Sequence, residues 1–362
     1  MPESHQTSRK LDEKFLEAFL NAPSVSGHEQ PAQRLFRQFV QPYVEEMTTD
    51  VMGNVITKTN SSGSPKIMLA GHCDEVGMQI RYSSEKGFLY FNGIGGLDAH
   101  LLPGARVQIL SKNGPIFGVI GKKAIHLQEA EERKKVIPLK EQYIDIGARS
   151  REEVETMGIQ IGDPAIFDYY YSPLGQNGDI VSRCFDDKIG GFIVAEIMKR
   201  LKEEQFHAAL YGISTTQEEV GLRGAQTSVF SVEPDIALVY DVDFVMDTPS
   251  SEEKYHGRVK LGGGPIVATG PNMNPILFDL IVKTAEEMEI AIQIIAEPRG
   301  TGTDANTIQL SKSGVCIGLF GIPNRYMHSY SEIVNLQDVE EIICLSVEVI
   351  KRITPEMNFI PK

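Results

Sequence analysis

Five segments of this chain end an apolar run with aspartate, glutamate or histidine side chains. The run at 66–71 continues into His72, Asp74 and Glu75, and the other four segments end in Asp186-Asp187, Glu218-Glu219, Asp241 and His328. Burying titratable groups without partners costs on the order of several kcal/mol each, so a surface turn, a salt-bridged corner or a metal site must compensate them. Two imidazoles and several carboxylates, with no thiolate among them, suit zinc, cobalt or manganese.

The carboxylates outnumber the needs of one metal ion, which indicates two ions that share a bridging carboxylate. Such a pair, roughly 3.5–4 Å apart, holds an attacking water and stabilises a tetrahedral intermediate. On an extended strand His72 and Asp74 point to one side, so Asp74 could accept the second ring N–H of His72. Glu218 and Glu219 diverge in an extended backbone, so one could bind metal while the other acts as a general base.

Each of these residues also has a structural interpretation. A histidine at a strand end is usually a hydrogen-bonded structural residue, Asp186 and Asp187 could cap a helix, and adjacent glutamates are usually solvated. Asp241 and Asp243 share one face, so spacing alone does not say which would bind metal. We favour the metal site because the structural account must explain five coincidences at equivalent places. The other histidines stand in polar or loop contexts and are interpreted as non-ligands: His5, His28, His100, His126, His207 and His256.

The elements that must position these side chains alternate between strands and helices, which is typical of an α/β sheet covered on both faces. Apolar residues at three-and-four spacing predict helices at 10–22, 28–45, 187–202, 275–288, 304–311 and 336–353. Apolar, β-branched runs predict strands at 51–59, 66–72, 208–215, 235–242, 291–296 and 315–320. In such sheets ligands bind outside the carboxyl ends of the strands, where the acidic and imidazole side chains are expected.

Between residues 75 and 166 the pattern changes to short β-type runs separated by glycine, asparagine and serine, at 79–84, 88–92, 106–110 and 116–121. No long helical pattern interrupts them before the acidic stretch EEVETMG. This block predicts a small β-barrel or β-sandwich inserted into the α/β domain. It contains none of the predicted ligands, so we expect it to take no part in the chemistry.

The composition bounds the class of protein. Its 362 residues, 41% hydrophobic and 23% charged, suffice for one large domain with a smaller one. The formal net charge of -14 argues against a nucleic-acid or anionic-membrane partner, although acidity often serves solubility alone. No apolar run approaches the roughly 18 residues of a membrane span, and the stretch MPESHQTSRK has no signal-peptide core. The scattered cysteines favour a reducing, cytoplasmic location: Cys73, Cys184, Cys316 and Cys344.

The glycine-rich stretch GTGTDAN at 300–306 resembles a dinucleotide-binding loop, but the strands and the acidic residue of such a unit do not surround it. We expect it to cap the following helix through Thr303 or Asp304 and to shape the floor of a pocket. The chain contains neither a Walker motif nor a GxSxG motif.

Five motifs, in this order, resemble those of the tetrahedral (TET-type) aminopeptidases: GHCDEVG, FDDKIGG, TTQEEVGLRGA, YDVDFVMDTP and RYMHSYSE. These are glutamyl- or deblocking-aminopeptidase-like dinuclear metallopeptidases, some of which carry the name endoglucanase. The stretches between the motifs, such as GGLDAHLLPGARV and YIDIGARSREE, also resemble the family, so the match covers nearly the whole chain.

The resemblance implies a fold similar to the zinc exopeptidases, with a mixed sheet sandwiched by helices. The catalytic domain would comprise 1–72 and 167–362, interrupted at 73–166 by a PDZ-like or barrel-like dimerisation domain. The expected partners are peptide substrates and further copies of the chain, from a dimer up to a dodecamer, with no nucleic acid and no membrane.

The resemblance also implies two divalent ions, with zinc preferred and cobalt or manganese as alternatives. It assigns His72 and Asp241 to one ion, Glu219 and His328 to the other, Asp186 as the bridge, Glu218 as general base and Asp74 as the partner of His72. The family pattern selects Asp241 over Asp243, because its ligand aspartate precedes a valine and lies upstream of the Asp-Thr-Pro at 247–249. One departure is Arg299, which stands where the family has a glycine-rich run and leaves the preferred side chain open.

The sequence therefore predicts a cytoplasmic, metal-dependent aminopeptidase that removes N-terminal residues from peptides. Glu218 would take a proton from the attacking water and pass it to the leaving amine. An N-acyl-amino-acid deacylase with the same metal centre is the main alternative. An endoglucanase is a weaker alternative, because the chain has no tryptophan to stack on sugars. A catalytically inactive scaffold is disfavoured because every proposed ligand and Glu218 are retained.

Overall fold

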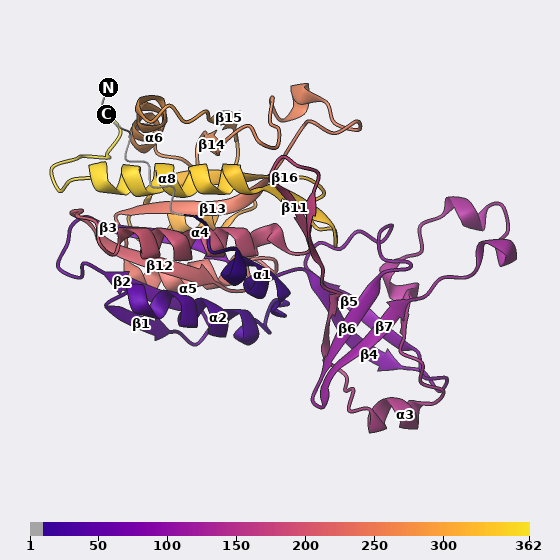
Figure 1. Ribbon diagram of the computed structural model, residues 1–362. Helices are drawn as coiled ribbons and strands as arrows, with labels where there is room; N and C mark the ends of the chain where they lie inside the picture. The colour runs from indigo at the N-terminus through magenta and orange to yellow at the C-terminus, as the bar shows by residue number, and fades with distance from the viewer. Residues whose placement is uncertain (1–9) are drawn as a thin grey trace.

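The computed structural model, drawn in Figure 1, describes residues 10–362. Its centre is an eight-stranded mixed sheet in the order β1-β2-β12-β3-β13-β16-β14-β15. The bounds of these strands are β1 Glu46–Thr49, β2 Val55–Thr59, β3 Lys66–His72, β12 Ala209–Thr215, β13 Ile236–Phe244, β14 Ile266–Thr269, β15 Gln293–Ala296 and β16 Cys316–Asn324. The four central strands β12, β3, β13 and β16 are parallel, whereas β2 and β14 run antiparallel to their central neighbours.

Helices cover both faces of this sheet, and β3 shows why. Its residues are almost all buried, and alternate side chains enter two different cores: Ile67 and Leu69 lie in the larger core, Met68 and Ala70 in the smaller one. The larger core is closed by α1 Glu13–Asn21, α2 Gln30–Val40, α4 Phe185–Leu201, α6 Pro275–Glu287 and α8 Leu336–Arg352. The smaller core is closed by α5 Arg223–Val232 and α7 Asp304–Gln309.

The inserted block forms a closed barrel that stands at one end of the α/β body (Figure 1). The barrel strands are β4 Gly77–Ser83, β5 Leu89–Ile94, β6 Arg106–Ser111, β7 Gly114–Ile120, β8 Tyr143–Asp145 and β9 Pro164–Phe167. They enclose a core of their own, which includes Ile80, Phe91 and Val107. A short helix, α3 Arg151–Thr156, precedes β9, and the segment between β7 and β8 carries only single 3-10 turns.

Three further strands form a small antiparallel sheet in the order β10-β11-β17. Their bounds are β10 Tyr171–Leu174, β11 Asp179–Ser182 and β17 Glu332–Asn335. This sheet joins the chain that returns from the barrel to the chain that leads into α8, so it fixes the start of α4 beside the loop after β16.

The predicted α/β sheet covered on both faces, with an inserted β-barrel, is confirmed. All six predicted helices exist, and Thr303 caps α7 by accepting a hydrogen bond from the backbone of Ala305. The prediction missed α5, the small sheet and two strands of the central sheet, β1 and β14. It also ended two strands early: β13 continues to Phe244 and β16 to Asn324. Among residues 10–362, no helix combines the length and apolarity needed to cross a bilayer.

Candidate metal centre

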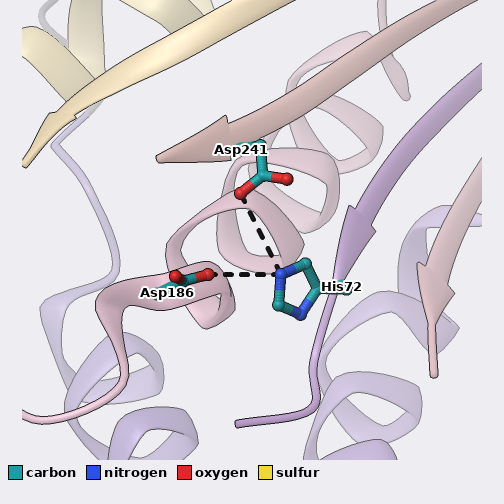
Figure 2. A group of neighbouring side chains, drawn as sticks. All are labelled: His72, Asp186 and Asp241. Carbon is teal, nitrogen blue, oxygen red and sulfur yellow. Dashed lines mark ion pairs between the residues drawn. The ribbon is translucent and has the colours of Figure 1, made fainter. Parts of the chain in front are cut away.

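The parallel strands bring the predicted ligands to one edge of the sheet. His72 is the last residue of β3, and Asp241 lies on the neighbouring β13, two residues beyond its last pairing with β3. Asp186 comes from the irregular first turn of α4. Figure 2 shows the carboxylates of Asp186 and Asp241 directed at the His72 ring. His72 Nε2 lies 3.2 Å from Asp186 Oδ1 and 3.9 Å from Asp241 Oδ1.

A second group of possible ligands shares Asp186. His328, from the loop after β16, places its Nε2 3.1 Å from Asp186 Oδ2 and 3.4 Å from Glu219 Oε1. In each group the possible ligand atoms lie within 4.8 Å of one another. The two oxygens of Asp186 therefore face one histidine each, which is the geometry of a carboxylate that bridges two sites.

The other ring nitrogen of each imidazole, Nδ1, already forms a hydrogen bond. His72 Nδ1 lies 3.1 Å from the backbone carbonyl of Asp74, and His328 Nδ1 lies 2.8 Å from that of Gly96. A carbonyl oxygen only accepts, so both Nδ1 atoms must donate. In the neutral rings the lone pair is then on Nε2, and each Nε2 faces one of the two carboxylate oxygens of Asp186. Lone pairs facing carboxylate oxygens at about 3 Å repel each other unless a cation or a proton lies between them.

Asp74 contacts both His72 and the loop that carries Glu218 and Glu219. The hydrogen bond from His72 Nδ1 goes to the backbone oxygen of Asp74, while the carboxylate oxygen lies 3.4 Å from the same nitrogen. The buried carboxylate accepts instead from the backbone N–H groups of Glu218 and Glu219, at 3.0 and 3.2 Å, and from Ser26 Oγ at 2.7 Å. Asp74 therefore fixes the loop that carries both glutamates.

Glu218 and Glu219 approach different histidines: Glu218 Oε2 lies 3.7 Å from His72 Nε2, and Glu219 Oε1 lies 3.4 Å from His328 Nε2. Glu219 lies in the second group of possible ligands, whereas Glu218 belongs to neither group and lines the adjacent cleft. Burial raises the pKa of Glu218 to about 10, opposed by His72 and reinforced by Asp241. Burial likewise raises the pKa of Glu219 to about 8, and the charge of Asp186 adds to the effect.

The residues present fit divalent cations. Burial raises the pKa of Asp241 well above its usual range, while the hydrogen bond to Asp186 raises that of His328 to about 9. The protein alone therefore holds protons where a site of this composition would otherwise be strongly anionic. Glu219 Oε1 is buried and has no hydrogen-bond partner within residues 10–362, so a ligand position is open on it. Cations displace such protons when they bind carboxylate and imidazole ligands.

Two buried carboxylates that are not among the predicted ligands, Glu332 and Asp187, hold the backbone of those ligands in place. Glu332, at the start of β17, accepts from the backbone N–H of Asp186 at 2.9 Å and from that of His328 at 3.0 Å. Asp187 accepts from the backbone N–H of His72 at 3.1 Å and from Gly190 in α4 at 3.0 Å. The capping interpretation thus holds for Asp187, while its neighbour Asp186 faces the cleft. Glu332 is the last residue of the motif RYMHSYSE, and this position was the signal in the sequence that could have identified its role.

Glu75, the third titratable residue at the tip of β3, points away from the metal centre. Its carboxylate forms ion pairs with the buried side chains of Arg183 and Lys188, and it accepts from Ser24. The residues at the end of β3 therefore fit two of the three interpretations, a metal site and a salt-bridged corner. His72 faces a possible metal site, and Glu75 forms a salt-bridged corner.

The barrel block also reaches the site, although we expected it to take no part in the chemistry. Gly96, just after β5, supplies the carbonyl that accepts from His328 Nδ1. A Cβ on Gly96 would lie 2.8 Å from that nitrogen, so only glycine allows this close approach. Among the histidines interpreted as non-ligands, His256 lines the cleft and pairs with Asp243 at 2.8 Å. His5 lies outside the described residues.

The family model for M42 glutamyl aminopeptidase matches residues 53–345. The chain belongs to the M42 family. Lysyl aminopeptidase of Pyrococcus furiosus is 33% identical over 355 residues, covering 97% of this chain and 100% of that protein.

Solved structures of TET peptidases have a similar fold. A TET aminopeptidase from a marine sediment archaeon of the Thaumarchaeota is 34% identical, with a TM-score of 0.91 over 95% of this chain and 97% of that one. The TET1 peptidase of Pyrococcus horikoshii, described as assembling into a tetrahedron or a large octahedral shell, is 29% identical, with a TM-score of 0.84 over 94% and 99%. Membership of a peptidase family, together with the acidic and imidazole groups, is consistent with a metal-dependent aminopeptidase.

Proposed function

We propose that this protein is a metal-dependent aminopeptidase that works with two divalent ions, preferably zinc. The observation that carries the proposal is the position of Asp186 between two histidines, with one carboxylate oxygen about 3 Å from each Nε2. We propose His72 and Asp241 as the remaining ligands of one ion and Glu219 and His328 as those of the other. When bound, such ions supply an acidified water and polarise the scissile carbonyl.

Residues of the chain itself would supply the general base and hold it in position. Glu218 lies outside both ligand groups and lines the cleft, so we assign it as the general base that takes a proton from the attacking water. It then delivers that proton to the leaving amine. Asp74 acts as a positioning residue, since it holds the backbone of Glu218 and Glu219.

We propose that the substrates are peptides with a free N-terminal amine. The buried carboxylates that face the cleft favour a cationic ammonium group at this end of the substrate, and they disfavour a neutral N-acyl group. The acidic net charge and the cysteine pattern support a cytoplasmic site of action.

We also propose that the barrel mediates self-association. Phe117, Ile125 and Leu127 on the barrel and its long loop are more than half exposed, and an apolar surface of this kind is typical of an interface. Assembly of the TET1 relative into closed shells supports the same proposal. A closed shell would restrict access to unfolded or short peptides.

The test is a panel of aminoacyl chromogenic amides, with free or acetylated amines, assayed on metal-stripped protein reloaded with zinc, cobalt or manganese. We expect cleavage of the free-amine substrates alone, and only after reloading. Preference for the acetylated substrates would identify a deacylase instead. Hydrolysis of cellulose that survives chelation would identify an endoglucanase.

A further inference from the structure

The cleft beside the metal centre has a second polar region that the proposed chemistry does not use. The cleft has a volume of about 590 Å³, within the range of pockets that enclose a small ligand. Besides the proposed metal ligands, its walls include Asp243, His256 and Glu297, together with the apolar side chains of Phe244 and Leu319. No lysine or arginine lines the cleft among the residues that the structure describes.

The charges in this second region do not cancel. Asp243 Oδ1 lies 2.8 Å from His256 Nε2, and this hydrogen bond raises the pKa of His256 above its usual value. Even with His256 protonated, the Asp243–His256 pair sums to zero. Glu297 then leaves the region with a net negative charge. Within residues 10–362 its carboxylate has no hydrogen bond or ion pair, and Arg299, two residues along the chain, is exposed and does not line the cleft.

The backbone that carries Glu297 is held in place from two sides. The N–H of Glu297 donates to the carbonyl of Thr269 at 2.8 Å, and the N–H of Thr301 donates to Asn272 Oδ1 at 3.0 Å. Gly270 has a φ of +144°, and a Cβ there would lie 2.0 Å from the Glu297 carbonyl oxygen. Because the chain approaches so closely, glycine is required at 270. Glu297 is therefore presented to the cleft by a fixed segment.

The same cleft also contains the proposed metal ligands. Glu219, with a side chain only 6% exposed, lines the cleft, and within residues 10–362 its Oε1 accepts no hydrogen bond, although His328 Nε2 lies 3.4 Å away. A peptide with its scissile bond at the metal centre therefore has its first side chain in the remainder of the cleft. Apolar walls suit a methylene stem, and a carboxylate suits a cationic head group.

We propose that Glu297, supported by the Asp243–His256 pair, selects peptides whose N-terminal residue is lysine or arginine. This inference rests on the proposed aminopeptidase function and names its substrate class. The stem of the basic side chain packs against Phe244 and Leu319, and its charged end pairs with Glu297. An N-terminal glutamate or aspartate is repelled by the same carboxylate.

The experiment compares lysyl, arginyl, leucyl and glutamyl amides on the metal-loaded, full-length protein. For the wild type we expect kcat/KM for the lysyl and arginyl amides to exceed that for the leucyl amide by roughly tenfold or more. Glu297→Gln should remove about tenfold of that preference, mainly through KM, and leave the leucyl amide within about twofold of wild type. Glu286→Gln, an exposed site on α6, makes the same change in net charge and should alter nothing. Glu297→Lys should favour the glutamyl amide.

Activity on the leucyl amide distinguishes a failure of the proposed function from a failure of the Glu297 assignment. The same activity shows that each variant is folded. If the loaded wild type hydrolyses none of the amides, the proposed function is refuted. If it hydrolyses the leucyl amide but Glu297→Gln leaves the lysyl-to-leucyl ratio unchanged, the assignment of Glu297 is refuted. Inhibition by free L-lysine and L-leucine gives a binding readout: the inhibition constant of L-lysine should rise about tenfold in Glu297→Gln and that of L-leucine should not change.

Discussion

Replacing Glu75 by glutamine tests whether the tip of β3 is divided between a metal site and a salt-bridged corner. Glu75 is 2% exposed and shares its carboxylate between Arg183 and Lys188, which are themselves buried. It also accepts from the backbone N–H and the hydroxyl of Ser24. Glutamine keeps the size of the side chain but removes the charge that both cations face.

The magnitude follows from the protonation of Glu75. Burial alone would raise its pKa, but the charges of Arg183 and Lys188 outweigh burial and lower the pKa from 4.5 to about 2. A fall of this size stabilises the folded state by about 3 kcal/mol at neutral pH. Because the folded pKa lies below the unfolded one, this contribution is complete above pH 4.5 and is lost as the pH falls toward 2. Two buried cations without their carboxylate raise the expected loss for the variant to about 3–5 kcal/mol.

The assay is urea unfolding followed by circular dichroism on chelator-treated protein, from pH 7 downward. The difference in free energy of unfolding between wild type and Glu75→Gln should be largest at pH 7 and shrink below pH 4.5. Glu85→Gln is the control, because its exposed pair with Arg151 is worth less than about 1 kcal/mol. A Glu75→Gln protein that keeps its stability but binds less metal would refute the reasoning, because Glu75 would then be a ligand.

Three further predictions concern the metal centre and the assembly. Glu218→Gln should lower kcat by roughly 100-fold or more with unchanged metal content. Glu219→Gln should instead lose metal from one site. Near-normal turnover in Glu218→Gln would contradict the assigned roles. Active protein should contain about two transition-metal ions per chain, and elemental analysis that finds none would rule out the dinuclear centre. Light scattering with a series of peptide lengths should find an assembly that cleaves only peptide ends, whereas a monodisperse monomer or internal cleavage of folded proteins would exclude a closed shell.

The parts of the site that the sequence could predict are those fixed by strand direction. His72 and Asp241 follow apolar runs that belong to neighbouring parallel strands, so both had to emerge at one edge of the sheet. His328 and Glu219 came from the same argument applied to β16 and β12. Nothing beyond the apolar pattern was needed to expect these side chains near one another, and their division between two ions came from the family resemblance.

The parts that could not be predicted depend on contacts between distant segments. Glu75 stands three residues after His72, which ends β3, and its different role depends on the position of Arg183 and Lys188. Glu297 belongs to a loop whose path is set by its approach to Gly270, which no local pattern encodes. α5 was missed because its sequence, RGAQTSVFSV, is rich in small and β-branched residues and its helix depends on packing against the sheet.

The connection between barrel and sheet links the barrel to the position of a proposed metal ligand. The chain leaves the sheet at the end of β3, builds the barrel, and returns to supply Asp186 at the start of α4. The barrel segment after β5 then lies against the metal centre, where the Gly96 carbonyl orients His328 through its Nδ1. A histidine whose Nδ1–H is held in this way keeps its Nε2 lone pair aimed at the site. If the barrel packs against a second copy, the same contact would stabilise both the assembly and the orientation of His328. Loss of the interface should therefore weaken metal binding at the His328 site before it weakens binding at the His72 site.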